Sequence, residues 1–398
     1  MTSNGVNLQK TIVILGGGTG GLVAANELKK KAGERARVIL IDKNPHYIYA
    51  PSFLWLMLGD RQAEKIQKPL SLLKRKGIEV VNEEIVDIDP AVKIVKTQNG
   101  DYQYDYLIIS LGAELAPEKI PGLAPNGYNL YELQEIERLR DDLKNFSGGK
   151  VAIVISSLPF KCPAAPYEAA FLLNERFQER GINGKTEINI YTPETLPLPA
   201  AGPDIGKVVA KMLEERKIGF NPEAKLVLVN PQKKELQFEN VKTANGSTVL
   251  TTSFDLLIFI PPHQGPKVVR DSGLGNEAGW IPVDKETLKT KYDKVFAIGD
   301  VIAATVASGK PRPKAGVFAH YEAEVVVENI VRELQGLPAD KKYDGRASCF
   351  LETGFGKAGF AYGNFYNVPA PAIKMKRPGR MWHWGKILFE KYWLWKWF

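Results

Sequence analysis

The sequence feature that most constrains the fold is a glycine-rich turn directly after a short apolar run. Residues 11–15 (TIVIL) are typical of a buried strand, and Gly16, Gly18 and Gly21 follow as G-x-G-x-x-G at the start of a helical segment. The first glycine would permit a tight turn, the second would let the backbone approach a pyrophosphate, and the third would let the helix pack on the strand. The start of that helix would offer its unpaired N–H groups to the phosphates.

A second apolar strand supports this interpretation. Residues 37–42 (RVILID) complete a strand–helix–strand unit, whose parallel strands imply a right-handed crossover. Asp42 ends this strand 21 residues after Gly21, where its carboxylate could accept hydrogen bonds from a ribose. We expect the neighbouring Lys43 to belong to the same site. The sequence therefore predicts a dinucleotide-binding domain, against the alternative of a glycine-rich turn without a ligand.

A second α/β unit lacks the glycines that a nucleotide needs. Residues 150–155 and 187–192 are predicted strands, and residues 164–181 between them have the pattern of a helix. No glycine lies between Gly149 and Gly181, so side chains and prolines would keep the backbone away from a pyrophosphate. We therefore expect a second Rossmann-like domain that has no nucleotide site.

The remaining segments divide the chain into three regions. Apolar runs at residues 255–262 and 294–301 look like strands that return to the first domain. The expected regions are a first domain of residues 1–115 and 252–336, a second domain of 116–251, and a C-terminal region of 337–398. Further predicted elements are strands at 84–89, 92–96, 105–110 and around 347–352, a helix over 317–336, and a proline-rich loop at 193–203. The predicted fold class is α/β, with two Rossmann-like domains and a C-terminal amphipathic, membrane-binding region.

The net charge of +8 is concentrated near the C-terminus. Residues 374–398 hold seven basic residues and one acidic residue, a net charge of +6, so the rest of the chain carries only +2. This distribution argues against a nucleic-acid partner. Trp384, Leu388, Tyr392 and Trp395 recur at helical spacing with lysines between them, which favours a helix that lies on an anionic lipid surface. The alternative is an aromatic helix that covers the core or closes a dimer interface.

Other global features exclude several classes of protein. No apolar run reaches about 18 residues, and the N-terminus does not resemble a secretory signal, so we expect a peripheral, monotopic protein of the cell membrane. Two cysteines rule out a disulfide scaffold and leave either two unrelated core thiols or one functional couple. The four histidines are too scattered to form a metal site.

A motif late in the chain identifies the expected dinucleotide as FAD by resemblance. The segment KVFAIGDV, with Gly299 and Asp300, resembles the T/A-x-G-D motif of flavoproteins with two dinucleotide-binding domains, whose aspartate contacts the ribityl and phosphate part of FAD. Gly112, in SLGAEL, resembles that family's A-T-G turn. The resemblance implies that the helix beginning near Gly316 faces the flavin, where Lys314 would stabilise the anionic reduced ring. The alternative for Lys314 is a solvated loop lysine.

The surroundings of both cysteines resemble those of sulfide:quinone oxidoreductases and flavocytochrome c sulfide dehydrogenases. Cys162 lies in PFKCPAAPYEAAF, where a nucleotide turn would stand, and Cys349 lies in ASCFLETGFGKAGF. The resemblance extends over nearly the whole chain and implies a redox couple whose disulfide is attacked by HS⁻, with Cys349 on the flavin side and Cys162 carrying the sulfane sulfur. Glu168 stands at the family's acidic position and would relay protons near the thiolate. A surface glutamate on a helix is the alternative.

The chain also departs from these relatives. Many of them have a third cysteine, but residues 111–150 contain none, which implies a two-cysteine mechanism. Ala50 stands about where the flavocytochrome relatives use a cysteine to tether FAD, so we expect non-covalent FAD. The proline loop near residue 195 has no counterpart of the catalytic histidines of some relatives.

The expected function is oxidation of sulfide to polysulfide or persulfide sulfur, with two electrons passing through FAD to a membrane quinone. Phe355, Phe360 and Tyr362 are candidates to line the quinone pocket, although aromatic residues at such positions are as often plain core. The alternatives are a type II NADH dehydrogenase-like NADH:quinone oxidoreductase, a flavocytochrome c-type sulfide dehydrogenase, and a catalytically silent flavoprotein. The oligomeric state stays open, with a homo-oligomer among the options.

Overall fold

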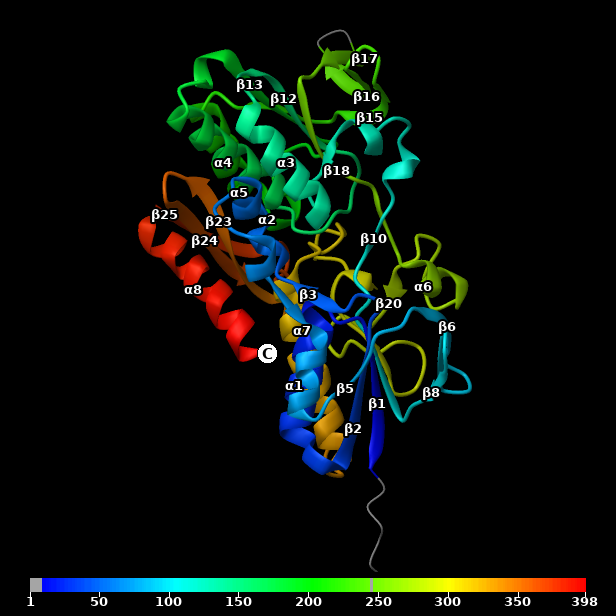
Figure 1. Ribbon diagram of the computed structural model, residues 1–398. Coiled ribbons are helices and arrows are strands. Elements are labelled where there is room, and N and C mark those ends of the chain that lie inside the picture. Colours follow the sequence, from blue (N-terminus) through cyan, green and yellow to red (C-terminus); the bar gives the residue numbers. More distant parts are fainter. Residues whose placement is uncertain (1–8, 244–245) are drawn as a thin grey trace, which may run out of the picture.

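The computed structural model describes residues 9–243 and 246–398 and contains two five-stranded parallel sheets, one above the other in Figure 1. The first sheet has the strand order β21-β9-β1-β2-β5. Residues 12–15 of its central strand are completely buried, as expected for a parallel sheet that is covered on both faces. The strands are β1 (Lys10–Leu15), β2 (Ala36–Ile41), β5 (Glu79–Val81), β9 (Tyr106–Ile109) and β21 (Val295–Ala297).

Helices and a small antiparallel sheet cover this first sheet. Helices α1 (Thr19–Ala32) and α7 (Gly316–Leu334) lie side by side, and β6, β7 and β8 lie on the other side of β1 (Figure 1). The predicted helix at 317–336 and the predicted strands at 84–89 and 92–96 are confirmed as α7, β6 and β7. The bounds of the small sheet are β6 (Ile85–Asp89), β7 (Ile94–Thr97) and β8 (Asp101–Gln103).

The second sheet has the strand order β11-β18-β12-β13-β14 and corrects one sequence prediction. The apolar run at 255–262 forms β18, but β18 pairs with β11 and β12 in the second sheet, so the prediction that it returns to the first domain is wrong. The run alone could not decide this, because both sheets need buried parallel strands with the same apolar pattern. The strands are β11 (Tyr128–Asn129), β12 (Gly149–Ile155), β13 (Thr186–Tyr191), β14 (Gly219–Asn221) and β18 (Leu256–Ile260).

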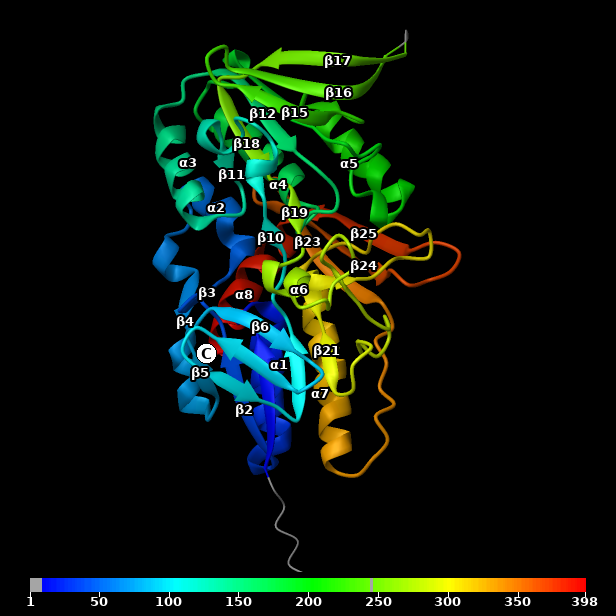
Figure 2. The same ribbon diagram turned by 90° about the vertical axis from the view of Figure 1, so that its right-hand side faces the viewer.

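Two antiparallel segments carry the chain between the two domains. Strand β10 (Glu114–Leu115) pairs with β19 (His263–Gln264), and Figure 2 shows both strands at the junction of the two sheets. The second domain is therefore one continuous stretch of chain whose two ends lie together. Its remaining elements are α3 (Leu133–Asn145), α4 (Ala165–Glu179), α5 (Pro203–Glu215) and the antiparallel strands β15 (Lys225–Asn230), β16 (Glu235–Thr243) and β17 (Gly246–Ser253).

The C-terminal region forms a third layer that contacts both domains. Strand β23 packs against α4 of the second domain and α7 of the first, and α8 packs on the sheet formed by β23, β24 and β25. Its elements are β23 (Arg346–Gly354), β24 (Lys357–Asn364), β25 (Ala372–Gly379) and α8 (Arg380–Lys396). The shorter elements elsewhere are β3 (His46–Ile48), β4 (Gln67–Pro69), β20 (Ile281–Pro282), β22 (Ile302–Ala303), α2 (Phe53–Met57) and α6 (Lys267–Asp271).

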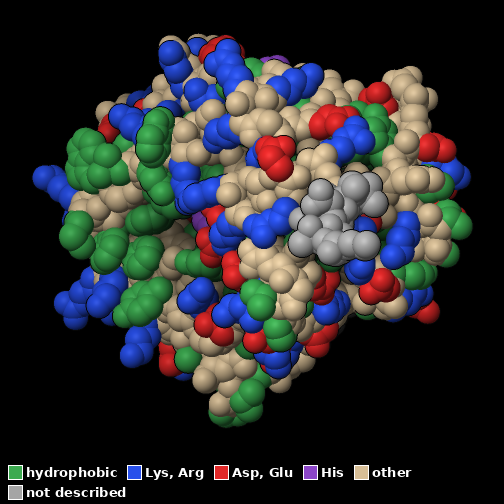
Figure 3. Space-filling view, turned by 90° about the horizontal axis from the view of Figure 1, so that it is seen from below, with side chains coloured by type: hydrophobic (Ala, Val, Ile, Leu, Met, Phe, Trp, Pro, Cys, Tyr) green, Lys and Arg blue, Asp and Glu red, His purple; other side chains and the backbone are tan. Residues whose placement is uncertain are grey.

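Helix α8 has two different faces. The four residues predicted from helical spacing all lie on its exposed face, where Trp384 is 60% and Trp395 is 76% exposed. Figure 3 shows hydrophobic side chains gathered on one side of the molecule, with lysine and arginine side chains around them. Among the described residues, no helix is long and apolar enough to cross a membrane. The inner face is buried and consists of Lys386, Glu390, Trp393 and Leu394, with Trp397 just beyond the helix.

The charge count in the tail needs a correction, because two of its charged residues do not face solvent. Glu390 is buried and accepts hydrogen bonds from Arg61 (Nη2–Oε2, 2.8 Å) and Ser52 (Oγ–Oε1, 3.0 Å). Lys386 is 6% exposed and contacts buried carboxylates. Neither residue contributes to a charged outer surface, and both attach α8 to the body of the protein.

We expect Glu390→Ala to weaken the packing of α8 on the body of the protein, because the guanidinium of Arg61 then lies beside an empty, largely buried site. Removing one partner of such a pair costs about 3 kcal/mol of stability. The thermal midpoint should fall, and amide hydrogen exchange should accelerate in α8. Lys391→Ala, on the exposed side of the same helix, is the matched control and should change stability by less than about 0.5 kcal/mol. Equal stability of the two variants would contradict the conclusion that Glu390 attaches α8 to the body of the protein.

Candidate active site

Cys162 lies in the turn after β12, where the second domain meets the first. Its N–H donates to the carbonyl of Lys314 (2.6 Å), and its own carbonyl accepts the N–H of Ala165 at the head of α4 (3.0 Å). Lys161 forms a parallel bridge with Lys314, and the Tyr131 hydroxyl donates to the carbonyl of Lys161 (2.5 Å). Cys162 has a φ of +50°, in the left-handed region. The turn that would hold a nucleotide in this unit is instead attached to the first domain.

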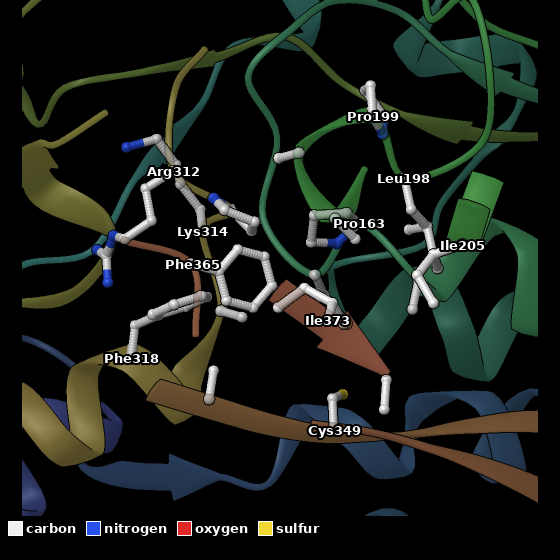
Figure 4. A pocket seen from close by; sticks show the side chains of 18 of the residues that line it. Pro163, Leu198, Pro199, Ile205, Arg312, Lys314, Phe318, Cys349, Phe365 and Ile373 are labelled. Atoms are coloured by element: carbon white, nitrogen blue, oxygen red, sulfur yellow. The ribbon is translucent and has the colours of Figure 1, made fainter. Parts of the chain in front are cut away.

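Cys349 lies in the middle of β23, opposite Ala361 on β24. Its side chain faces a pocket of about 420 Å³ that Cys162 also lines, and both residues are free thiols. Figure 4 shows the sulfur of Cys349 pointing from the strand into this pocket. The structure thus brings together the two cysteines that the sequence paired by resemblance.

The pocket is mainly apolar and is built from all three layers of the molecule. The C-terminal sheet contributes one face of its strands, the second domain contributes the proline loop, and the first domain contributes the start of α7 (Figure 4). Members of this lining are Ala347, Leu351, Ala361, Ile373 and Met375 from the sheet, Leu198, Pro199 and Ile205 from the second domain, and Phe318 from α7.

Both thiols are held in their neutral form. Burial is the largest cause, raising the pKa of Cys349 to about 11 and the pKa of Cys162 further. Cys349 has exposed surface, but that surface faces the pocket, so protein still surrounds the sulfur on its other sides. The carboxylate of Glu168 raises the pKa of each thiol as well, and the ammonium of Lys386 lowers both.

Glu168 is not a surface residue. It is buried on α4, where Oε1 accepts the N–H of Glu352 (2.8 Å) and the ammonium of Lys386 (2.9 Å). The second carboxylate, Glu352, contacts His383 through Nδ1 (3.0 Å) and lies 4.0 Å from Lys386. The sequence prediction named Glu168 but missed Lys386, Glu352 and His383. Helical spacing on the tail could have indicated that Lys386 and Glu390 share a face with Trp393.

A further buried carboxylate lines the pocket from the proline loop, where the sequence suggested no catalytic group. Glu194 accepts hydrogen bonds from the hydroxyls of Tyr167 and Thr192. Burial raises the pKa of Glu194 to about 7. A single glutamate among prolines has no periodic pattern, so no sequence signal could have placed it here.

The glycine turn has the geometry that the motif predicts. Gly16 has a φ of +93°, and a side chain at Gly21 would collide with the carbonyl oxygen of Gly16. A Cβ at Gly18 would meet no protein atom within 4 Å, which leaves its surface open to a ligand. The carboxylate of Asp42 accepts the N–H of Gly17 (2.6 Å) and therefore lies beside the turn. These features fit the pyrophosphate and ribose of a dinucleotide.

The Gly299–Asp300 segment and Lys314 form the other part of the cradle. The Gly299 N–H donates to buried Glu322 (2.7 Å), and the Lys314 ammonium donates to the carbonyl of Asp300 (2.5 Å). Oδ1 of Asp300 is buried without a hydrogen-bond partner in the described part of the chain, as a hydroxyl-bearing ligand such as the ribityl chain would require. Lys314 is buried with its ammonium 3.6 Å from the centre of the Trp280 ring, so it is not a solvated loop lysine. Burial lowers the pKa of Lys314 to about 8.

The other predicted cofactor residues differ in how closely they join this cradle. Gly112 has a φ of +69° and no protein atom near an added Cβ, and Gly316 begins α7 next to Thr19 at the head of α1. Lys43 is exposed and pairs with Glu84 (3.5 Å) on the surface. The geometry therefore favours a flavin contact for the two glycines more than for Lys43.

Of the three predicted quinone residues, Phe360 and Tyr362 lie together and Phe355 lies apart from them. Tyr362 lies at the edge of the pocket, whereas Phe360 stacks on Trp382 of α8 with ring centroids 4.7 Å apart. Phe355 is 44% exposed in the turn between β23 and β24. Phe360 and Tyr362 are stacked on each other in the layer under α8 (6.0 Å), so Phe355 is the one separated from the group.

Substitution of two glycines should separate folding from FAD binding. Gly21→Ala places a methyl group against the Gly16 carbonyl, which should destabilise the apoprotein by about 1–3 kcal/mol. Gly18→Ala should leave apoprotein stability unchanged but weaken FAD binding at least about tenfold, because the methyl group blocks the close approach of the pyrophosphate. Thermal unfolding and titration with FAD measure the two effects. If Gly18→Ala destabilised the apoprotein as much as Gly21→Ala does, the prediction of open space beside Gly18 would be contradicted.

Comparison with known proteins agrees with this geometry. The family model for pyridine nucleotide-disulphide oxidoreductases matches residues 10–323. The mitochondrial sulfide:quinone oxidoreductase of Dictyostelium discoideum is 31% identical over 369 residues, which cover 88% of this chain and 78% of the relative. The X-ray structure of the sulfide:quinone oxidoreductase from Aquifex aeolicus superposes with a TM-score of 0.87 at 27% identity, covering 98% of this chain and 91% of that one.

A more distant relative has a different electron donor in its name. The type II NADH:quinone oxidoreductase of Staphylococcus haemolyticus is 24% identical over 381 residues, which cover 89% of this chain and 90% of the relative. The stronger similarity is to the sulfide-oxidising enzymes, and it extends over both domains and the C-terminal layer. The chain belongs to the sulfide:quinone oxidoreductases, within the pyridine nucleotide-disulphide oxidoreductase family.

Proposed function

We propose that this protein oxidises sulfide to polysulfide or persulfide sulfur through Cys162, Cys349 and non-covalent FAD, and passes two electrons to a membrane quinone. The observation that carries the proposal is the common pocket of the two thiols, next to the Lys314 loop that carries the FAD cradle. Relatives that are similar over most of this chain are named sulfide:quinone oxidoreductase and sulfide-quinone reductase. Ala50 is exposed and has no nucleophile for a covalent flavin link.

The sulfur chemistry uses the oxidised form of the pair. HS⁻ attacks the sulfur of Cys162 in a Cys162–Cys349 disulfide, so that the disulfide bond breaks, a new S–S bond forms on Cys162, and Cys349 leaves as a thiolate. The sulfide proton goes to a nearby base, for which buried Glu168 is the candidate. Bound FAD would accept the electron pair and pass it to the quinone. The overall balance is H₂S and quinone to S⁰ and quinol.

Lys314 would favour the reduced state of the flavin. Its ammonium is buried beside Asp300, at the head of α7, whose N-terminal end also carries partial positive charge. A cation held at this point stabilises negative charge that develops on a bound ring. Its lowered pKa of about 8 means that this charge would be lost in alkaline solution.

NADH is disfavoured as the electron donor. The turn after β12 has no glycine, and it carries Cys162 and the buried Phe160 where a pyrophosphate would approach. A flavocytochrome-type acceptor would not require the exposed apolar face of α8. A quinone that reaches the protein from the lipid would require that face. The aromatic cluster formed by Phe360 and Tyr362 of β24 and Trp382 of α8 is the proposed entry to its site.

The exposed face of α8 supports attachment to an anionic lipid surface. Trp384, Leu388 and Trp395 project from this face, and exposed basic residues stand beside it. Each basic residue near such a surface contributes about 1 kcal/mol. The exposed members are Lys374, Lys376, Arg377, Arg380 and Lys391. This arrangement is suited to reversible attachment in the plane of the interface.

Cys162→Ser and Cys349→Ser should each abolish bleaching of the bound flavin by sulfide, because either change removes the disulfide. The test is anaerobic titration of the purified yellow protein with sulfide and, separately, with NADH, which should not bleach it. Ser348→Ala, next to Cys349 on β23, is the control and should bleach normally. Full bleaching by sulfide in either cysteine variant, or rapid bleaching of the wild-type protein by NADH, would refute the proposed function.

Serine at Trp384, Leu388, Tyr392 and Trp395 together should weaken binding to anionic vesicles by about two decades or more, because several kcal/mol of apolar burial is lost. Co-sedimentation measures the binding, and added salt should weaken it further. The buried face of α8 stays intact in this variant, so bleaching by sulfide should persist. Val208→Ser, an exposed apolar residue of α5, is the control. Unchanged vesicle binding in the serine variant would refute attachment through this face.

A further inference from the structure

Lys386 is buried on the inner face of α8, whose other face is exposed. Its Nζ lies 2.9 Å from Oε1 of Glu168 and 4.0 Å from Oε1 of Glu352. It also lies 5.0 Å from the centre of the Trp55 ring. No other lysine or arginine of the described chain is paired with either carboxylate. A buried ammonium with two carboxylates and an aromatic ring is a specific site and not a membrane-facing charge.

The ammonium of Lys386 joins the segments next to the two cysteines. Glu168 stands on α4, which begins directly after the Cys162 turn, and its carboxylate also accepts the N–H of Glu352. Glu352 stands on β23, three residues after Cys349. One ammonium therefore connects α4 and β23, the two elements next to or carrying the cysteines, with α8.

The ionisable groups around the two sulfurs have opposing effects. Glu168 disfavours a thiolate at either cysteine, and a thiolate at Cys349 disfavours one at Cys162. Tyr131 and Tyr49 are neutral, since burial raises the pKa of each hydroxyl well above its ordinary value. Lys386 is the cation that acts on both thiols, and its own pKa is raised by Glu168, Glu352 and Cys349 against the effect of burial. Without it, Glu168 and Glu352 would be two buried carboxylates sharing one site.

We propose that Lys386 is a positioning residue of the sulfur reaction, which keeps Glu168 in place and supplies the positive charge that lets Cys349 and Cys162 exist as thiolates. This inference rests on the proposed function only in taking the two thiols as the reacting groups. It follows that α8 has two separate roles, with an outer face for the lipid surface and an inner residue for the reaction. Deletion of the tail would therefore remove both roles at once.

The test measures the two thiols directly and does not depend on turnover. The reduced FAD-loaded protein is alkylated with iodoacetamide from pH 7 to pH 11, and the rates at the Cys162 and Cys349 peptides are followed by mass spectrometry. Lys386→Gln should slow alkylation of both cysteines at least about tenfold at pH 9, since one unit of pKa changes the thiolate fraction about tenfold. Lys386→Arg, which keeps the charge, should restore most of the rate. Lys391→Gln, on the exposed face of α8, should alkylate like the wild type.

A second variant distinguishes electrostatics from damaged packing. Glu168→Gln removes the opposing charge and should accelerate alkylation, so the two substitutions should shift the pH profile in opposite directions. If Lys386→Gln loses its flavin, Glu168→Gln and Lys386→Arg still carry the test. A shift in the same direction for both substitutions, or none for either, would overturn the role of Lys386. If the alkylation profiles shift as expected but sulfide does not bleach the flavin of the wild-type protein, the result would count against the proposed function alone.

Discussion

The structure depends on the attachment of the Cys162 turn to the Lys314 loop. A backbone hydrogen bond of 2.6 Å and the bridge between Lys161 and Lys314 join the second domain to the first at the carboxyl ends of their strands. In a nucleotide-binding unit this turn would need glycines and open space. Here it is closed against the other domain, so the sulfur of Cys162 lies beside the proposed flavin cradle instead of a second dinucleotide.

The C-terminal layer completes the site that the two domains begin. Strand β23 brings Cys349 over the junction, and the same sheet provides an apolar wall for the pocket. Burial in this apolar setting keeps both thiols neutral, so the nearby charges decide how readily each one ionises. Those charges come from α4, β23 and α8, and the packing of the tail helix and the chemistry of the thiols are therefore linked.

Local motifs were predictable from the sequence, and long-range pairings were not. The glycine turn and Asp42 could be placed together because they lie in one short strand–turn–helix–strand stretch with fixed spacing. Asp300 and the two cysteines were named through the resemblance of their short surrounding segments to a known family, and the structure places the two cysteines at one pocket. Strand β18 was assigned to the wrong sheet, because an apolar run contains no information on its partner. A count of tail charges treated Lys386 as solvent-facing, although only tertiary packing shows that it meets Glu168.

The insertion of one domain into the other has a consequence for the order of assembly during synthesis. The second domain is continuous between β10 and β19, so its sheet can close as soon as β18 has left the ribosome. The first domain must wait, because its outer strand β21 and its helix α7 come later in the chain. Non-local pairing of this kind is slow and exposes apolar edges while it is incomplete. Cys162 and Cys349 come to line one pocket only when the sheet that carries Cys349, which is synthesised late, has folded.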